Sequence, residues 1–253
     1  PYLGYQQITM REHFGTASYN SLQLQLNRRY INGLQFAVAY TFGKTVSDGT
    51  NFDTTRPGAA WNEGPDGATQ FHNLVINYTW DVPGGSRMWD NWFTRGALDG
   101  WQLSGDTAFV SGDWAGASTS TTDNFDFTGG DGGTRPDITG DPLCTSGNCD
   151  VTPGAGGSYF NIAAFSRLSG RGDIGNAPVT FYRLPKIVLS NMSIFKNFQL
   201  GGGRRIQIRW EAYNVFNQVN WSTLNVNAQF NPAGEQVNAN FGQFVLNAKD
   251  NEA

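Results

Sequence analysis

The 253-residue sequence has few charged residues and no long apolar segment. Charged residues make up 15% of the chain, and the formal net charge is −4. Ordinary soluble domains contain roughly 25% charged residues. Since no basic stripe is present to neutralise phosphates, we expect no nucleic-acid partner. No run of about 18 apolar residues occurs, so no transmembrane helix is predicted. A membrane barrel built of strands would pass undetected by that criterion.

Residues typical of catalytic and metal sites are also scarce. The two histidines, His13 and His72, lie far apart in the sequence. The chain has no Gly-x-Ser-x-Gly, His-Glu-x-x-His or phosphate-binding motif. We therefore predict a protein that is not an enzyme and has no cofactor. The only cysteines, Cys144 and Cys149, enclose a Thr-Ser-Gly-Asn segment. This spacing predicts a local disulfide in an oxidising compartment, with two free thiols as the alternative.

What the sequence does contain is a strict alternation of apolar and polar residues. From Tyr19 to Phe42 the apolar positions are every second residue, which predicts a β-hairpin. A three-residue loop at 31–33 would place most bulky side chains on one face. It would pair Tyr30 with Leu34, Leu26 with Val38, and Leu22 with Phe42. We therefore predict a type I turn with a bulge and Gly33 at positive φ.

The same alternation predicts four further strands. The expected strands span about 17–30, 34–43, 70–82, 100–112, 186–199 and 204–217, with a short amphipathic helix within 86–98. Long polar loops are expected at about 44–69, 113–184 and 218–240. The second of these loops contains an apolar knot at 159–165. We expect the whole of 1–253 to be a portion of one β-domain.

Two architectures fit alternating strands of this kind: a soluble β-sandwich and a membrane β-barrel. The connections alternate between short and long along the chain, so all long loops fall on one rim of an up-and-down sheet. That arrangement is typical of outer-membrane barrels with long extracellular loops. Aromatic residues near the short-turn rim resemble a girdle: Tyr30, Trp80, Trp89, Trp92, Trp101 and Phe198. We therefore predict an all-β, antiparallel, up-and-down portion of a transmembrane barrel.

In a barrel of this kind the polar face of the strands lines the lumen. The side chains expected on that face are Gln23, Gln25, Arg29, Asp81, Asp106, Arg209 and Glu211. They either form a polar network to a plug or act as simple cross-strand ion pairs, and the second interpretation is favoured for Arg209 and Glu211.

The long loops contain two further candidate sites. Aromatic residues that either stack on a sugar ligand or pin the loops together are Phe52, Trp61, Phe125, Tyr159 and Phe165. A Gly-rich stretch holds the carboxylates of Asp123, Asp126 and Asp131. Flexible oxygen-rich loops suit calcium, but the spacing matches no known calcium loop, so a solvated loop is favoured.

Several sequence segments, spread along nearly the whole chain, resemble one protein family. They are YNSLQLQLNRRYINGLQFAVAYTFGK, WNEGP at 61–65, WQLSG at 101–105, YFNIAAF at 159–165, NMSIFKNFQL at 191–200, and IQIRWEAYNVFNQVNW followed by NFG. Together they are similar to the C-terminal barrel part of TonB-dependent receptors. The similarity is to the Oar-like, carboxypeptidase-regulatory-domain-bearing kind common in Acidobacteria. The resemblance implies a 22-stranded barrel with an N-terminal plug, energised through TonB.

The resemblance leads to two hypotheses of function. In the first, the chain is a section of an outer-membrane receptor that imports an oligosaccharide, a peptide or a metal chelate. Its partners would be outer-membrane lipid and the TonB complex. In the second, a barrel fragment with open strand edges self-associates into an extracellular fibre or sheath. The start at Pro1 and the absence of the family's plug and early strands favour a piece of a longer protein.

Overall fold

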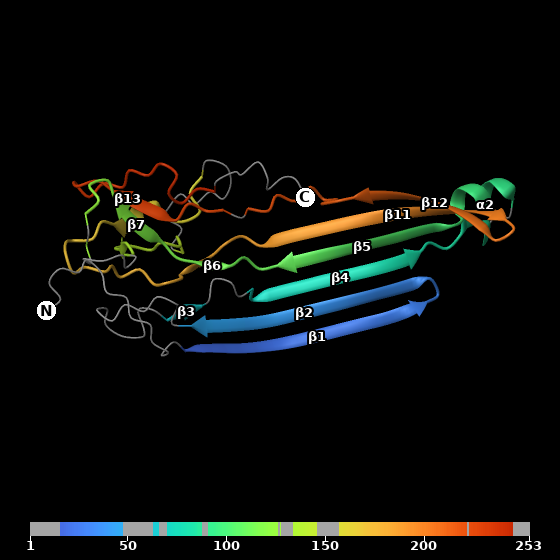
Figure 1. The fold of residues 1–253 in the computed structure, drawn as a ribbon, viewed down its shortest axis with the longest axis horizontal. Helices are drawn as coiled ribbons and strands as arrows, with labels where there is room; N and C mark the ends of the chain where they lie inside the picture. Colours follow the sequence, from blue (N-terminus) through green and yellow to red (C-terminus); the bar gives the residue numbers. More distant parts are fainter. Residues whose placement is uncertain are drawn as a thin grey trace, which may run out of the picture.

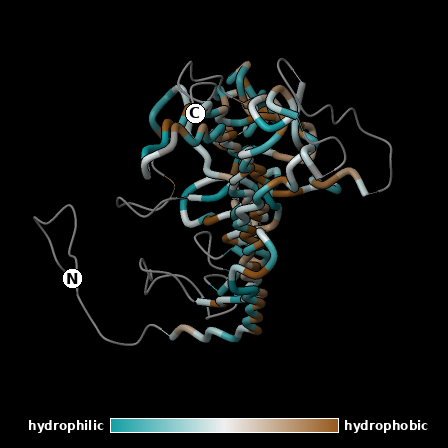
Figure 2. Tube along the Cα trace, turned by 90° about the vertical axis from the view of Figure 1, so that its right-hand side faces the viewer, coloured by the Kyte–Doolittle hydropathy of each residue, from teal (hydrophilic) through white to brown (hydrophobic). Residues whose placement is uncertain are grey.

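The computed structural model describes residues 16–47, 63–65, 70–87, 91–125, 127, 134–145, 157–221 and 223–244. Its long axis follows an antiparallel sheet with a folded cap at one end (Figure 1). The sheet appears as one thin layer when viewed along the strands, and the cap is broader (Figure 2). No helix among these residues has the length and apolar character that a membrane span requires.

Six long strands form the sheet in the order β1-β2-β4-β5-β11-β12, with the short β3 against β2. Their bounds are Ala17–Ile31 for β1, Leu34–Ser47 for β2, Gly64–Pro65 for β3, His72–Asp81 for β4, Trp101–Val110 for β5, Ile187–Gly201 for β11 and Arg204–Ala212 for β12. The predicted antiparallel, up-and-down order is confirmed. Within the described residues, β1 and β12 each pair on one side alone, so the sheet is open.

The ladder registers carry the alternation from strand to strand. Leu26 lies opposite Val38, and Val38 lies opposite Ile76 on β4. Directly opposed residues share a face of the sheet. One face, called the apolar face below, therefore collects the Leu, Ile, Phe, Tyr and Trp of successive strands. The other, the polar face, collects mainly Gln, Asn, Ser, Thr and charged side chains.

The first hairpin differs from its prediction at the turn. Leu22 and Leu26 pair as expected, but Ile31 rather than Tyr30 lies opposite Leu34. Asn32 and Gly33 form a two-residue turn with φ of 54° and 78°, as in a type I′ turn, whose twist matches that of the strands. The bulge is present but lies between Arg28 and Ile31. The predicted three-residue loop is wrong, and the positive φ of Gly33 is confirmed.

The bulge changes the face on which Tyr30 lies. Its hydroxyl donates to Asp81 Oδ2, and Asp81 belongs to the polar face through its pairing with Gln102. The backbone N–H of Asp81 also bonds Gly33 O. Tyr30 therefore binds the neighbouring strand on the polar side, and its assignment to an apolar girdle was wrong.

The connection between β4 and β5 contains the predicted short helix. A 3₁₀ helix, η1, spans Gly85–Arg87, and α2 spans Trp92–Leu98. Asn91 caps α2: its side chain accepts from Thr94 N, and the Thr94 hydroxyl accepts from Asn91 N. This reciprocal capping satisfies two N–H groups that a seven-residue helix would leave unpaired. Together with the β1–β2 and β11–β12 turns, this connection forms the short-turn end of the sheet (Figure 1).

At the opposite end, the described parts of 111–186 and 213–244 fold together as the cap. Its short elements are β6 (Trp114–Ala115), β7 (Ser118–Thr121), β8 (Asp137–Ile138), η2 (Ile162–Ala164), β9 (Phe165–Ser166), β10 (Tyr182–Arg183) and β13 (Asn227–Phe230). Strand β13 pairs in parallel with β7, and β10 pairs with β6. The segments expected as long loops therefore contain short strands and pack against each other.

The cap has a hydrophobic core of its own. Phe160, Phe230 and Phe241 are each about 1% exposed, and the cluster also includes Phe165 and Tyr182. Full burial of one such side chain contributes about 1.5–3 kcal/mol. These residues come from both long segments, so the core holds the two together. The apolar knot predicted at 159–165 supplies two of its rings.

Candidate functional site

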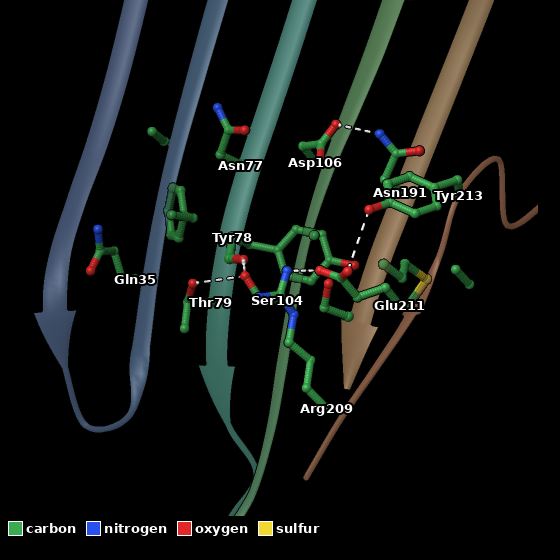
Figure 3. A pocket seen from close by; sticks show the side chains of 16 residues that line it. Gln35, Asn77, Tyr78, Thr79, Ser104, Asp106, Asn191, Arg209, Glu211 and Tyr213 are labelled. Atoms are coloured by element: carbon green, nitrogen blue, oxygen red, sulfur yellow. Dashed lines mark hydrogen bonds and ion pairs between the residues drawn. The ribbon is translucent and has the colours of Figure 1, made fainter. Parts of the chain in front are cut away.

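The polar face of the sheet carries a hollow of about 440 Å³ near the middle of the strands. Figure 3 shows side chains from β2, β4, β5, β11 and β12 around it. Its labelled lining includes Gln35, Asn77, Thr79, Ser104, Asp106, Asn191, Arg209, Glu211 and Tyr213. Amides, hydroxyls and carboxylates predominate, so the surface offers hydrogen-bond donors and acceptors with little net charge.

Asp106 and Asn191 lie at the centre of this surface. They are directly opposed on β5 and β11, and Asn191 Nδ2 donates to Asp106 Oδ2 at 3.1 Å. The Asn191 Oδ1 accepts from Asn214 N, also at 3.1 Å. Asn77 lies opposite Asp106 on its other side. The three side chains form a row across three strands, and Asp106 is held by an amide.

Arg209 and Glu211 are neighbours on one strand. They form an ion pair, and residues two apart on a strand share a face. Arg209 also lies opposite Phe195, with its guanidinium carbon 5.4 Å from the ring centroid. Tyr213 Oη donates to Glu211 Oε2 at 3.4 Å. The predicted ion pair is present, but it runs along β12 instead of across two strands.

Asp81 binds neutral partners. Gln102 Nε2 donates to Asp81 Oδ1 at 2.7 Å, and Tyr30 Oη donates to Oδ2. This carboxylate therefore joins β1, β4 and β5 near the short-turn end. The hydrogen bond from Tyr30 was not predictable from the alternation, because it depends on the bulge in β1.

The remaining residues expected on the polar face lie on β1. Gln23 is opposite Thr41 and Gln25 is opposite Ala39, and both glutamines are exposed. Arg29 lies within the bulge between Arg28 and Ile31. The two glutamines share the face of the hollow, but none of these three side chains is among its lining residues.

The loop aromatics occupy different environments in the cap. Phe165 is 5% exposed and belongs to the core. Tyr159 packs edge-on against Phe244, and its hydroxyl donates to Arg183 O at 2.7 Å. Burial raises the pKa of Tyr159. Both residues pin loop segments together. Phe125 is 38% exposed and stacks edge-on with Phe127, while Phe52 and Trp61 lie outside the described residues.

Beside the exposed Phe125, Arg167 contacts both a carboxylate and an aromatic ring. Its Nη2 lies 3.0 Å from Asp123 Oδ2, and its guanidinium carbon lies 5.8 Å from the Phe125 ring centroid. The hydrogen bond from Arg167 holds the pKa of Asp123 below its ordinary value. Asp123 is thus engaged by a cation, while Asp126 and Asp131, the other calcium candidates, lie outside the described residues.

Two other carboxylates have shifted pKa values in the cap. Asp173 accepts from Ser169 N and Oγ and from Gly175 N, and these hydrogen bonds lower its pKa. Desolvation, and then the charge of Asp173, raise the pKa of Asp137. Cys144 is disulfide-bonded, and Cys149 lies outside the described residues.

Three positions that sequence reasoning missed also shape the sheet. Tyr78 packs over Gly105 on the apolar face, where a Cβ would lie 2.7 Å from the tyrosine hydroxyl. The Asn220 side chain donates to Val188 O and accepts from Val188 N. It thereby supplies, near the start of β11, the hydrogen bonds that a neighbouring strand would make. Lys196 is buried among the apolar residues of β11. The sequence did hint at two of these positions, because Gly105 and Lys196 occupy places where the alternation calls for a large apolar residue.

Comparison with known proteins identifies the family. No curated protein and no solved structure matches the chain. The family model described as "Outer membrane beta barrel domain" matches residues 1–251. The open sheet, with one apolar and one polar face, agrees with a part of such a barrel wall. The chain therefore belongs to the outer-membrane β-barrel family and resides in the outer membrane.

Proposed function

We propose that the chain is a section of a TonB-dependent receptor that imports a large nutrient through a plugged barrel. The nutrient would be an oligosaccharide, a peptide or a metal chelate, and the protein would work without a catalytic step. The observation that supports the proposal is the polar face, whose row of Asn77, Asp106 and Asn191 would present hydrogen-bonding groups toward the lumen of a closed barrel. A wall of hydrogen-bonding groups with little net charge suits a large hydrated solute or a polar plug surface better than it suits a small ion.

The cap supports the same proposal. Short turns of outer-membrane barrels face the periplasm and long loops face outward, so the cap would be extracellular. Its core of Phe160, Phe230 and Phe241 gives it a fixed shape. A folded surface above the lumen is what a receptor needs to bind a ligand before import. Exposed Phe125 beside Arg167 is the strongest cap candidate for ligand contact.

The test is energy-dependent uptake by cells that express the complete gene product. Labelled oligosaccharides, peptides and ferric chelates would be offered with and without a functional TonB and with a protonophore. Uptake of one ligand class that requires both TonB and the proton gradient is the expected result. Passage that is insensitive to both would contradict the proposal, since a passive pore needs no energy.

The alternative to transport is a structural role, in which the protein assembles with copies of itself. The outer edges of β1 and β12 carry no pairing within the described residues, and open edges recruit further strands from any source. Recovery of the protein in extracellular fibres, with no ligand uptake, would favour self-assembly over transport.

A further inference from the structure

The connection between β4 and β5 forms a small knob at the short-turn end. Within it, Asp99 Oδ1 accepts from Ser86 N at 3.0 Å, which joins η1 to the end of α2. The hydrogen bonds from Ser86 lower the pKa of Asp99. Gly84 and Gly85 lie so close to Asp99 and Leu98 that a Cβ at either glycine would overlap those side chains. The described residues of 82–100 are therefore a packed unit.

Lys196 fixes this knob against the apolar face of the sheet. It lies opposite Trp101 on β11 and is 3% exposed. Its Nζ donates to Ala97 O at 3.1 Å and to Asp99 O. Trp101 Nε1 donates to the same Ala97 O at 2.8 Å. A cation at the C-terminal carbonyls of a helix is electrostatically favourable.

The position of Lys196 otherwise makes little sense in a wall that contacts lipid. An ammonium group on the lipid side of a barrel is costly unless it reaches a polar partner. Here the partners are carbonyl oxygens of the knob and the rings of Trp101 and Phe198, whose centroids lie 5.0 and 5.2 Å away. The lysine thus holds the knob on the lipid side of the wall.

The outer surface of the knob is strongly apolar. Trp92 is 85% exposed and Phe93 is 63% exposed, with ring centroids 6.0 Å apart. Thr94, on the opposite side of α2, is buried. The sheet residues at this end are also apolar and exposed, among them Trp80 and Leu200. The aromatic pair therefore adds exposed apolar surface to the short-turn end of the wall.

We propose that α2 is a membrane-interface anchor, with Trp92 and Phe93 inserted among phospholipids of the leaflet at the short-turn end. Large aromatic rings prefer the depth of the headgroups, where an apolar body and a polar rim are both accommodated. A helix too short to be stable alone needs external fixation, which Lys196 supplies. The anchor sets the depth of the wall in the bilayer. It does not depend on what the barrel transports.

Photo-crosslinking tests the anchor directly in the full-length protein reconstituted in phospholipid vesicles. A benzophenone amino acid replaces Phe93, and the same group at Asn27, on the polar face of β1, is the control. The expected result is a covalent phospholipid adduct at position 93 and none at position 27. An adduct to a second polypeptide at position 93, or no adduct there, would overturn the proposal.

Lys196→Met tests the role of the lysine while preserving most of its volume. The variant loses the hydrogen bonds to Ala97 and Asp99, so α2 should detach from the sheet and the yield of the lipid adduct at position 93 should fall. The strands should keep their protease resistance. An undiminished yield of the lipid adduct in Lys196→Met would show that Lys196 does not hold α2 in place.

Discussion

At the scale of single residues, close packing on the apolar face depends on one glycine. Gly105 lies beneath Tyr78, and a Cβ there would be 2.7 Å from both Asn191 O and Tyr78 Oη. Gly105→Ala should therefore destabilise the wall by about 1–3 kcal/mol, as overpacking does in well-packed interiors. Urea unfolding in vesicles, followed by the mobility of the folded form on gels, measures the change.

Gly96→Ala is the matched control for that substitution. Gly96 lies in α2, and no atom lies within 4 Å of the point that an alanine Cβ would occupy. Alanine in a helix interior is favoured over glycine by about 0.5–1 kcal/mol, so this variant should not lose stability. Equal unfolding midpoints for Gly105→Ala and the wild type would show that Tyr78 does not need the space above Gly105.

The ion pair between Asp123 and Arg167 predicts a pH dependence confined to the cap. Hydrogen bonding from Arg167 lowers the pKa of Asp123 from its ordinary value of 3.8. A lowered folded-state pKa stabilises the cap above the ordinary value, and this contribution is lost as the pH falls through the lowered one. Amide exchange near residues 121–127, corrected for its intrinsic pH dependence, should therefore accelerate only below about pH 4.

Asp123→Asn supplies the control, because it keeps the shape of the side chain and removes the titration. The variant should show faster exchange than the wild type at neutral pH and no additional acceleration that begins near pH 4. A wild-type profile that is already rising at pH 6 would assign the effect to another group.

At the scale of elements, the side chain of Asn220 continues the hydrogen bonding of β11 past the end of β12. Strand β12 ends at Ala212, and Asn214 and Asn217 then adopt positive φ of 47° and 49°. The chain returns to β11 at Asn220, whose amide brackets Val188 with bonds of 2.9 and 3.0 Å. The left-handed backbone conformation of Asn214 and Asn217 interrupts the extended chain, which explains why the strand ends earlier than the predicted residue 217.

Asn220→Ala should cost about 1–3 kcal/mol, because it leaves the N–H and C=O of Val188 without their partner. Exchange of the Val188 amide should accelerate, while amides near Asn197, at the other end of β11, should not change. Asn220→Asp retains an acceptor and should fall between the alanine variant and the wild type. Unchanged exchange at Val188 in the alanine variant would contradict the bracketing role.

The cap core makes a second prediction at this scale. Phe160 is 1% exposed among the rings of Phe165, Tyr182 and Phe241. Phe160→Ala should destabilise the cap by about 3–5 kcal/mol, and proteases should cleave the cap before the sheet. Phe216, 64% exposed, is the control, since Phe216→Ala removes a ring of the same size that is not buried. Equal cleavage rates in the two variants would exclude Phe160 as a core residue.

At the scale of the whole molecule, the sheet was predictable and the cap was not. Alternation fixed the strands and most of the hairpin register, because a slip of one residue would turn Leu22 and Leu26 to the polar face. The position of the bulge escaped prediction, and with it the hydrogen bond from Tyr30 to Asp81, which is 51 residues away. The parallel pairing of β7 with β13 joins two short strands about 109 residues apart. Strand β7 is Ser-Thr-Ser-Thr, with no apolar residue, and the alternation of β13 lasts for only four residues.

The candidate site was predictable by face but not by partner. The alternation placed Asp81, Asp106, Arg209 and Glu211 on the polar face, as observed. It did not indicate that Asp106 binds Asn191, or that Arg209 binds a neighbour on its own strand. Partners depend on side-chain directions across strands, and the sequence specifies only which face each residue occupies.

The central claim is that one face of the sheet contacts lipid along its whole width. Nitroxide labels placed singly at residues 74–79 of β4, in the full-length protein in vesicles, test it most directly. Collision with oxygen, which concentrates in the bilayer, should peak at 74, 76 and 78 and fall at 75, 77 and 79. Equal values along the strand, or low values at all six positions as between two stacked sheets, would contradict the account.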